Sequence, residues 1–268
     1  NDFFEEIAKC RASRKVWYKL LTERFGAKNK KSLLMRYHVQ TAGVTLPATE
    51  PYNNITRSAI QGLAAVLGGC QSLHIDSYDE AYSAPTEEAA LVSLRSQQII
   101  QAETGVVNTV DPLAGSYYVE YLTNEMADRI EAYIKKIEDM GGLVAAVESG
   151  WLHREISAYN MHYQKRIETG EYKVVAVNYM RDETASASDI AVYKYPETLS
   201  RQKAKLEKLR SDRDDQKVKE CMDILREKCH SDENLYPYTI EAVKNLVTLG
   251  EIEELFREEF GLWSFPLI

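Results

Sequence analysis

The chain has 268 residues, of which 44% are hydrophobic and 28% charged, and its formal net charge at pH 7 is −8. This composition is that of a globular protein, and the acidic excess argues against a nucleic-acid surface, because binding to phosphates depends on clustered Lys and Arg. The apolar runs are far shorter than the roughly 20 residues of a membrane-spanning helix, and no secretory signal opens the chain. We therefore expect a protein of the cytoplasm, or otherwise of an organelle matrix, without nucleic-acid or membrane partners.

The first half of the chain alternates helix-like and strand-like segments. Apolar residues at helical spacing predict a helix over residues 3–24, and the mostly apolar run 33–40 predicts a buried strand. The next helix, over residues 53–67, ends at a Gly-Gly pair that suits a left-handed cap. Residues 71–76 predict a second strand. A further helix begins near Pro85 and runs to about residue 103, since Pro and acidic residues suit a first turn.

This alternation is the repeat of a parallel α/β sheet, in which ligands bind at the carboxyl ends of the strands. Two parallel strands cannot bury both of their faces, because parallel sheets are stable only when they are covered on both sides and extended by neighbours. We therefore expect the missing strands to come from a partner chain or from another part of a longer polypeptide.

From residue 116 onward the pattern is helical. An apolar stripe predicts a helix that begins at Thr123, a good N-cap, and ends at Gly141 and Gly142. A strand is possible over residues 172–178, and the apolar end 263–268 is expected to dock against the protein. Further helices are expected over 142–149, over 152–169, once or twice within the charged stretch 200–228, and twice within 236–260.

Polar side chains occur within the first predicted strand. Arg36, His38 and Gln40 alternate with Tyr37 and Val39, which places the three polar side chains on one face. A barrel interior is normally filled by branched apolar residues, and a buried Arg without partners is costly. The pattern therefore favours a ligand site over plain packing.

A second polar cluster lies at the second strand, and it leaves a metallohydrolase as an alternative. His38 and His74 would be two metal ligands, with Asp76 or Glu80 completing the site. That reading needs ligands from further strands, and the four cysteines have neither a CxxC pair nor a metal-ligand spacing. P-loop, GxGxxG, HExxH and GxSxG signatures are also absent. We therefore predict no metal site.

These segments together resemble the methylmalonyl-CoA mutase family. The resemblance is close over about residues 3–180 and looser beyond, and so many ordered motifs make coincidence a poor explanation. The motifs are RYHVQTAGVTL at 36–46, two Asn at 53–54 before an Ala-rich helix that ends at Gly-Gly, QSLH at 71–74, DEA at 79–81, PT at 85–86 and VDPLAGSYYVE at 110–120.

The resemblance implies an α/β fold with two parts. Residues 1–115 would be the C-terminal part of a partial (β/α)8 TIM barrel, with its last two strands, and residues 116–268 would be a mostly α-helical extension. It implies that the barrel binds an acyl-CoA substrate and that the corrin of adenosylcobalamin covers the carboxyl ends of the strands. Another chain or segment would supply the first barrel strands, and a cobalamin-binding domain or subunit would supply the lower ligand of the cofactor.

At positions that match the family's motifs, the resemblance also implies site residues. Glu80 would accept hydrogen bonds from the ribose of the cofactor, and Gly43 would allow its close approach. No residue is assigned as a catalytic acid or base. The implied substrate-binding residues are His38, Gln40 and Gln71. The implied cofactor-binding residues are Gly43, Asp76, Glu80, Ala81, Ser83 and Gln164.

The implied reaction is the radical 1,2-rearrangement that interconverts methylmalonyl-CoA and succinyl-CoA. The chain departs from the family at Asp76, where Asn is common, and at Ser83, where a small apolar residue is common. Isobutyryl-, ethylmalonyl- and hydroxyisobutyryl-CoA therefore stay open as substrates. A non-catalytic assembly subunit of such an enzyme also stays open, and the two departures would be early signs of it.

Overall fold

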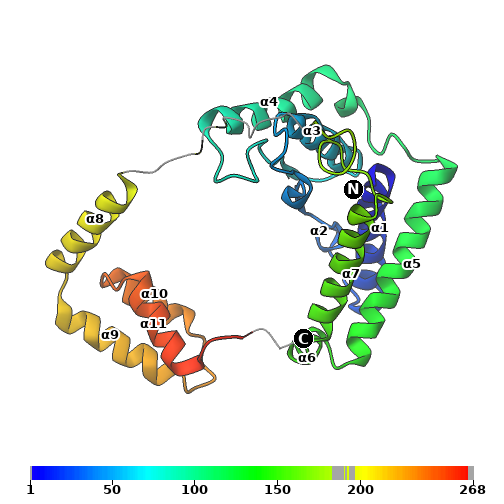
Figure 1. Ribbon diagram of the computed structural model, residues 1–268. Coiled ribbons are helices and arrows are strands. Elements are labelled where there is room, and N and C mark those ends of the chain that lie inside the picture. The colour runs from blue at the N-terminus through cyan, green and yellow to red at the C-terminus, as the bar shows by residue number, and fades with distance from the viewer. Residues whose placement is uncertain (1, 183–189, 191, 193–196, 265–268) are drawn as a thin grey trace. The chain divides into compact units, whose positions relative to one another are not determined.

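The structure, a computed structural model, describes residues 2–182, 190, 192 and 197–264. These residues are mostly helical and contain one small parallel sheet (Figure 1). The chain divides into two compact units between residues 193 and 194. The predicted division at residue 115 separates a barrel part from a helical extension and does not concern compact units. That division stays a prediction.

Helix α1 (Phe3–Lys19) opens the first unit. It begins after Asp2, whose carboxylate accepts hydrogen bonds from the backbone N–H groups of Phe4 and Glu5 and so caps the helix. A π-helical turn, Leu20–Arg24, continues it. The predicted helix over residues 3–24 is therefore confirmed.

Strands β1 (His38–Gln40) and β2 (Ser72–His74) pair in parallel, with His38 opposite Ser72 and Gln40 opposite His74. The predictions of strands over 33–40 and 71–76 were right in type but too long. The segment Lys30–Leu33 instead forms the short helix α2, capped by Asn29. A strand needs partners for its backbone groups, and among the described residues each of these strands has only the other as a neighbour.

Two helices follow the strands as predicted. Helix α3 (Asn53–Leu67) connects the two strands and α4 (Glu87–Glu103) follows the second. Thr86 caps α4 by accepting a hydrogen bond from the N–H of Ala89. Short 3-10 turns lie at Gly43–Thr45 and Val106–Asn108.

Helix α5 (Tyr117–Asp139) begins six residues before the predicted start, after Ser116. Thr123, the predicted N-cap, is buried inside the helix instead, where its Oγ1 donates to the carbonyl of Val119 and accepts from Arg11. Figure 1 shows α1 and α5 side by side, and the two helices pack against each other. A hydroxyl that has partners on both sides is satisfied within a helix, so the sequence signal for a cap was misleading here.

The core of the first unit consists of two buried clusters that both include residues of α1. Small side chains allow close helix packing, because they let the backbones approach. One buried cluster joins α1 to α5 and comprises Ala12, Val16 and Ala127. A second also reaches α3 and comprises Ile7, Ala64 and Val119.

Two further helices complete the first unit, α6 (Leu143–Glu148) and α7 (Trp151–Glu168). The possible strand over residues 172–178 is wrong, since this segment forms turns and an isolated bridge. Asn178 closes these turns, because its side chain accepts from the N–H of Val174 and donates to the carbonyl of Ile167. Those bonds occupy backbone groups that a strand would need.

The second unit consists of α8 (Thr198–Asp212), α9 (Asp215–Lys228), α10 (Tyr236–Lys244) and α11 (Leu249–Phe260), which confirms the predicted helices. Trp263, the first residue of the apolar end that was expected to dock, is exposed, and residues 265–268 lie outside the described residues, so the docking stays a prediction. In the described part of the chain, no helix has both the length and the apolar character to cross a bilayer. The core of the unit is formed by α9, α10 and α11 and contains Val218, Leu225, Ala242, Val247, Ile252 and Leu255.

Candidate functional site

One face of the β1–β2 pair is polar and exposed. The half-buried Val39 and Leu73 point to the opposite face, which confirms the predicted alternation along the first strand. Nδ1 of His38 in β1 lies 2.7 Å from Oγ of Ser72, the residue opposite it in β2. The four polar side chains of this face are His38, Gln40, Ser72 and His74.

Asp76 follows β2 and is bonded to Gln40 at the end of β1. The Nε2 of Gln40 donates to Oδ1 of Asp76 over 2.9 Å, and Nε2 of His74 lies 3.6 Å from the same oxygen. The backbone N–H of Asp76 donates to Oγ1 of Thr41 over 2.8 Å. The Asp76 residue is only 1% exposed, and its Oδ2 has no hydrogen-bond partner among the described residues. An unpaired buried oxygen calls for an explanation, and contact with a ligand is one of them.

Glu80 lies at the same end of the strands, beside Gly43. A Cβ on Gly43 would lie 3.1 Å from Cγ and from Oε1 of Glu80. Burial raises the pKa of the Glu80 carboxyl above its ordinary value, and the negative charge of Asp76 raises it further, while His74 lowers it. The carboxyl ends of β1 and β2 thus gather two acidic side chains, one amide and one imidazole.

Gln71 lies at the other end of β2. Its Oε1 accepts from the N–H of Tyr37 over 2.9 Å, and its Nε2 donates to the carbonyl of Gly69 over 3.1 Å. The structure therefore shows this amide holding backbone groups at the start of the strands, away from Gln40 and Asp76. Its predicted contact with the substrate stays a prediction.

The remaining predicted cofactor residues are spread over two regions. Ala81 follows Glu80 and is exposed. Oγ of Ser83 donates to the carbonyl of Ala84 over 2.9 Å. Gln164 is exposed on α7, where its Nε2 donates to Oε1 of Glu168 over 3.0 Å. Their contacts with a cofactor stay predictions.

Sequence reasoning missed Ser72 and Thr41 as parts of this site. Ser72 and His74 alternate with Leu73 just as His38 and Gln40 alternate with Val39, and this shared pattern was a usable signal. Thr41 has no such signal, because its role is to accept a bond from a residue 35 positions later in the chain. Among the described residues, no group of three or more His, Cys, Asp or Glu side chains is placed to share a metal ion.

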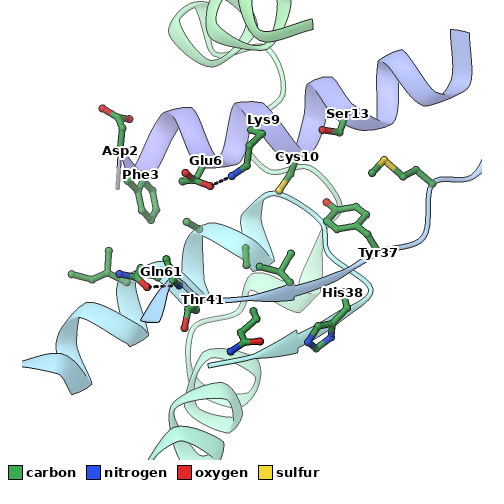
Figure 2. A pocket seen from close by; sticks show the side chains of 17 residues that line it. Asp2, Phe3, Glu6, Lys9, Cys10, Ser13, Tyr37, His38, Thr41 and Gln61 are labelled. Carbon is green, nitrogen blue, oxygen red and sulfur yellow. Dashed lines mark hydrogen bonds and ion pairs between the residues drawn. The ribbon is translucent and has the colours of Figure 1, made fainter. Parts of the chain in front are cut away.

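A cavity of about 420 Å³ lies between β1 and the helices α1 and α3 (Figure 2). The side chains of Phe3, Glu6 and Cys10 from α1 line it above the strand, and His38 and Thr41 line it from the strand segment. None of its lining residues belongs to β2. The cavity therefore extends along β1 and does not reach β2.

The family model described as Methylmalonyl-CoA mutase matches residues 1–262. The chain is 40% identical to the 2-hydroxyisobutanoyl-CoA mutase large subunit of Aquincola tertiaricarbonis, over 98% of this chain and 47% of that protein. It is 41% identical to methylmalonyl-CoA mutase of Rhizobium meliloti, over 97% and 36%, and 40% identical to the human mitochondrial methylmalonyl-CoA mutase, over 97% and 35%. The chain thus spans less than half the length of these relatives. It belongs to the methylmalonyl-CoA mutase family of isomerases.

Proposed function

We propose that this chain is the ligand-facing segment of an adenosylcobalamin-dependent acyl-CoA mutase. The observation that carries the proposal is the polar cluster at the carboxyl ends of two parallel strands, where Gln40, His74, Asp76 and Glu80 meet. Ligands of parallel α/β structures bind at this end, because the loops that follow the strands converge there. Family membership supplies the class of reaction to which such a site belongs.

The architecture that we propose is a partial (β/α)8 barrel. Residues 1–115 would form its last two strands and the helices between them, and residues 116–268 the helical extension. Two observations support this: β1 and β2 form a two-stranded parallel sheet, and a cavity extends along β1. The first barrel strands and a cobalamin-binding domain would come from other segments or subunits, in keeping with the fraction of the relatives that the chain spans.

The residues at the strand ends fit a large cofactor with hydroxyl and amide groups. Gly43 carries no side chain and Val44 is 98% exposed, so the loop after β1 is open to a ligand. The Glu80 carboxylate offers hydrogen-bond acceptors to ribose hydroxyls. Bound cobalamin would supply the radical chemistry, while the chain binds and orients the reactants and keeps water out. Contacts with the cofactor are also proposed for Asp76, Ala81, Ser83 and Gln164.

The substrate that we propose is methylmalonyl-CoA, held in part by His38, Gln40 and Gln71. A second candidate is 2-hydroxyisobutanoyl-CoA, because the chain is as similar to a large subunit with that name as it is to the methylmalonyl-CoA mutases. Isobutyryl-CoA and ethylmalonyl-CoA are further candidates of the same class. A cytoplasmic location stays a prediction.

The test is turnover by the assembled enzyme. The chain is combined with the segments that complete the barrel and with the cobalamin-binding part, and each of the four acyl-CoA esters is assayed with and without adenosylcobalamin. We expect cofactor-dependent isomerisation of one ester above all others. An assembled enzyme that retains the cofactor but converts none of the esters would contradict the proposal and support a non-catalytic assembly subunit.

A further inference from the structure

We propose that Asp76 is a positioning residue that turns the carboxamide of Gln40 so that its carbonyl oxygen faces the ligand. The inference deepens the proposed function and rests on it, since it specifies what kind of ligand group Gln40 meets. Asp76 itself is 1% exposed, whereas Gln40 is exposed on the polar face of the strands. The buried residue therefore acts through the exposed one.

The direction of the hydrogen bond decides the orientation. An ionised carboxylate carries no hydrogen, so the 2.9 Å bond from Gln40 to Asp76 Oδ1 can be donated only by Nε2. Because the amide is planar, its carbonyl oxygen then points away from Asp76. No described residue donates to that oxygen.

Asp76 is itself held in place. Its backbone N–H donates to Oγ1 of Thr41, the residue that follows Gln40, so the two strand ends are tied twice. Nε2 of His74 lies 3.6 Å from the same carboxylate oxygen that accepts from Gln40. A buried, tethered acceptor restricts the Gln40 amide to one of its two flipped states, which an exposed amide alone would not choose.

The consequence is a rule for the ligand. The atom that Gln40 presents is an acceptor, so the group that binds it must be a donor, such as an amide N–H or a hydroxyl. A thioester carbonyl or a carboxylate has only acceptors and would be disfavoured at this point. Acyl-CoA esters carry both kinds of group, and the geometry assigns Gln40 to an N–H or hydroxyl.

Exchanging the amide and the carboxylate between positions 40 and 76 tests this role of Asp76 in the assembled enzyme. Gln40→Glu places a second carboxylate about 2.9 Å from Asp76 Oδ1, and like charges at that distance cannot both be ionised without cost. Asp76→Asn in the same chain lets the new amide donate to the new carboxylate, whose outer oxygen is still an acceptor for the ligand. The matched control is Gln101→Glu, which adds the same charge on the exposed surface of α4.

The measurements are the melting temperature without substrate and the KM and kcat for the acyl-CoA ester. We expect Gln40→Glu to lower the melting temperature and to raise KM roughly tenfold, with a smaller change in kcat. The double variant should recover most of both effects, and Asp76→Asn alone should raise KM modestly, because asparagine permits either orientation of the amide. Gln101→Glu should change neither quantity.

Two results would overturn the role of Asp76. Melting effects that simply add in the double variant would show that the bond between the two side chains is absent. A recovered melting temperature combined with an unchanged KM in every variant would show that the bond is structural and positions nothing. A wild-type assembly without turnover would instead contradict the proposed function, and with it the inference about the ligand group that Gln40 binds. The melting temperatures of the single and double variants would still decide whether the bond between Gln40 and Asp76 exists.

Discussion

Gly43 and Glu80 lie against each other, so that a Cβ on Gly43 would be 3.1 Å from both Cγ and Oε1 of Glu80. Gly43 belongs to the loop after β1, and Glu80 follows β2 in the loop at the same end of the sheet. The contact therefore brings together two residues that the resemblance implied as cofactor contacts. The Glu80 side chain can lie where it does because Gly43 has no side chain to occupy that space.

Gly43→Ala should displace Glu80 without unfolding the protein. The backbone at Gly43 is not in the left-handed region, and the atoms that a methyl group would meet belong to a flexible side chain, which can move. We expect weaker cofactor retention by the assembled enzyme at an unchanged melting temperature. The matched control is Gly250→Ala on α11, where nothing lies within 4 Å. A large loss of stability in Gly43→Ala would contradict this account.

Glu80→Ala should weaken cofactor retention or turnover by roughly 1–3 kcal/mol, because ligand hydroxyls would lose their acceptor. The exposed Glu125 on α5 provides the control substitution Glu125→Ala. The measurement is cofactor retention during gel filtration together with kcat. Unchanged retention and turnover in Glu80→Ala would remove this residue from the site.

The raised pKa of Glu80 also predicts a pH effect on stability. Because the pKa is higher in the folded than in the unfolded protein, ionisation of Glu80 destabilises the fold, and this cost is present at neutral pH and disappears as pH falls below the ordinary value of 4.5. Glu80→Gln should therefore raise the melting temperature of the ligand-free enzyme at pH 7 and leave it unchanged near pH 4. An equal shift at both pH values would show that ionisation is not the cause.

Arg11 holds α1 to α5 through a nearly buried network. It donates to Asp111 and Glu120, and to Thr123 inside α5. Arg11→Met should cost about 2 kcal/mol of unfolding free energy, because the buried end of this network would lose its cation. Lys19→Met is the matched control, since it breaks an exposed ion pair between the same two helices. The unfolding free energy of both variants is measured by denaturant unfolding. Equal losses in Arg11→Met and Lys19→Met would show that burial does not strengthen the Arg11 network.

The second unit should lose stability in acid through Glu251. A hydrogen bond from Arg213 lowers the Glu251 pKa to about 2, and bonds from Thr248 at the start of α11 contribute. A carboxyl whose pKa is lower when folded stabilises the fold above its ordinary pKa, and that stability is lost as pH falls from about 4.5 toward 2. Glu251→Gln should flatten this part of the melting-temperature profile. A variant with the same acid dependence as the wild type would disprove the link.

The alternation of polar and apolar residues along both strands was readable from the sequence, because side chains of a strand point to opposite faces in turn. The long helices were readable for the same reason, since their apolar stripes recur at helical spacing. The resemblance to the family motifs implied Gln40, Gly43, Asp76 and Glu80 as ligand contacts from residue order alone. Local pattern and motif order therefore determined the elements, the family and the end of the sheet at which the site is proposed.

Other features depended on contacts that no local pattern contains. The strands are limited to His38–Gln40 and Ser72–His74 because backbone pairing requires a neighbour. Thr123 lies inside α5 and does not cap it, because its hydroxyl bonds to the carbonyl of Val119 and to Arg11 from another helix. The direction of the Gln40 amide depends on a carboxylate that lies 36 residues later in the chain. Only the tertiary structure brings these groups within bonding distance, since hydrogen-bond direction and burial are properties of atoms in space and not of residue order.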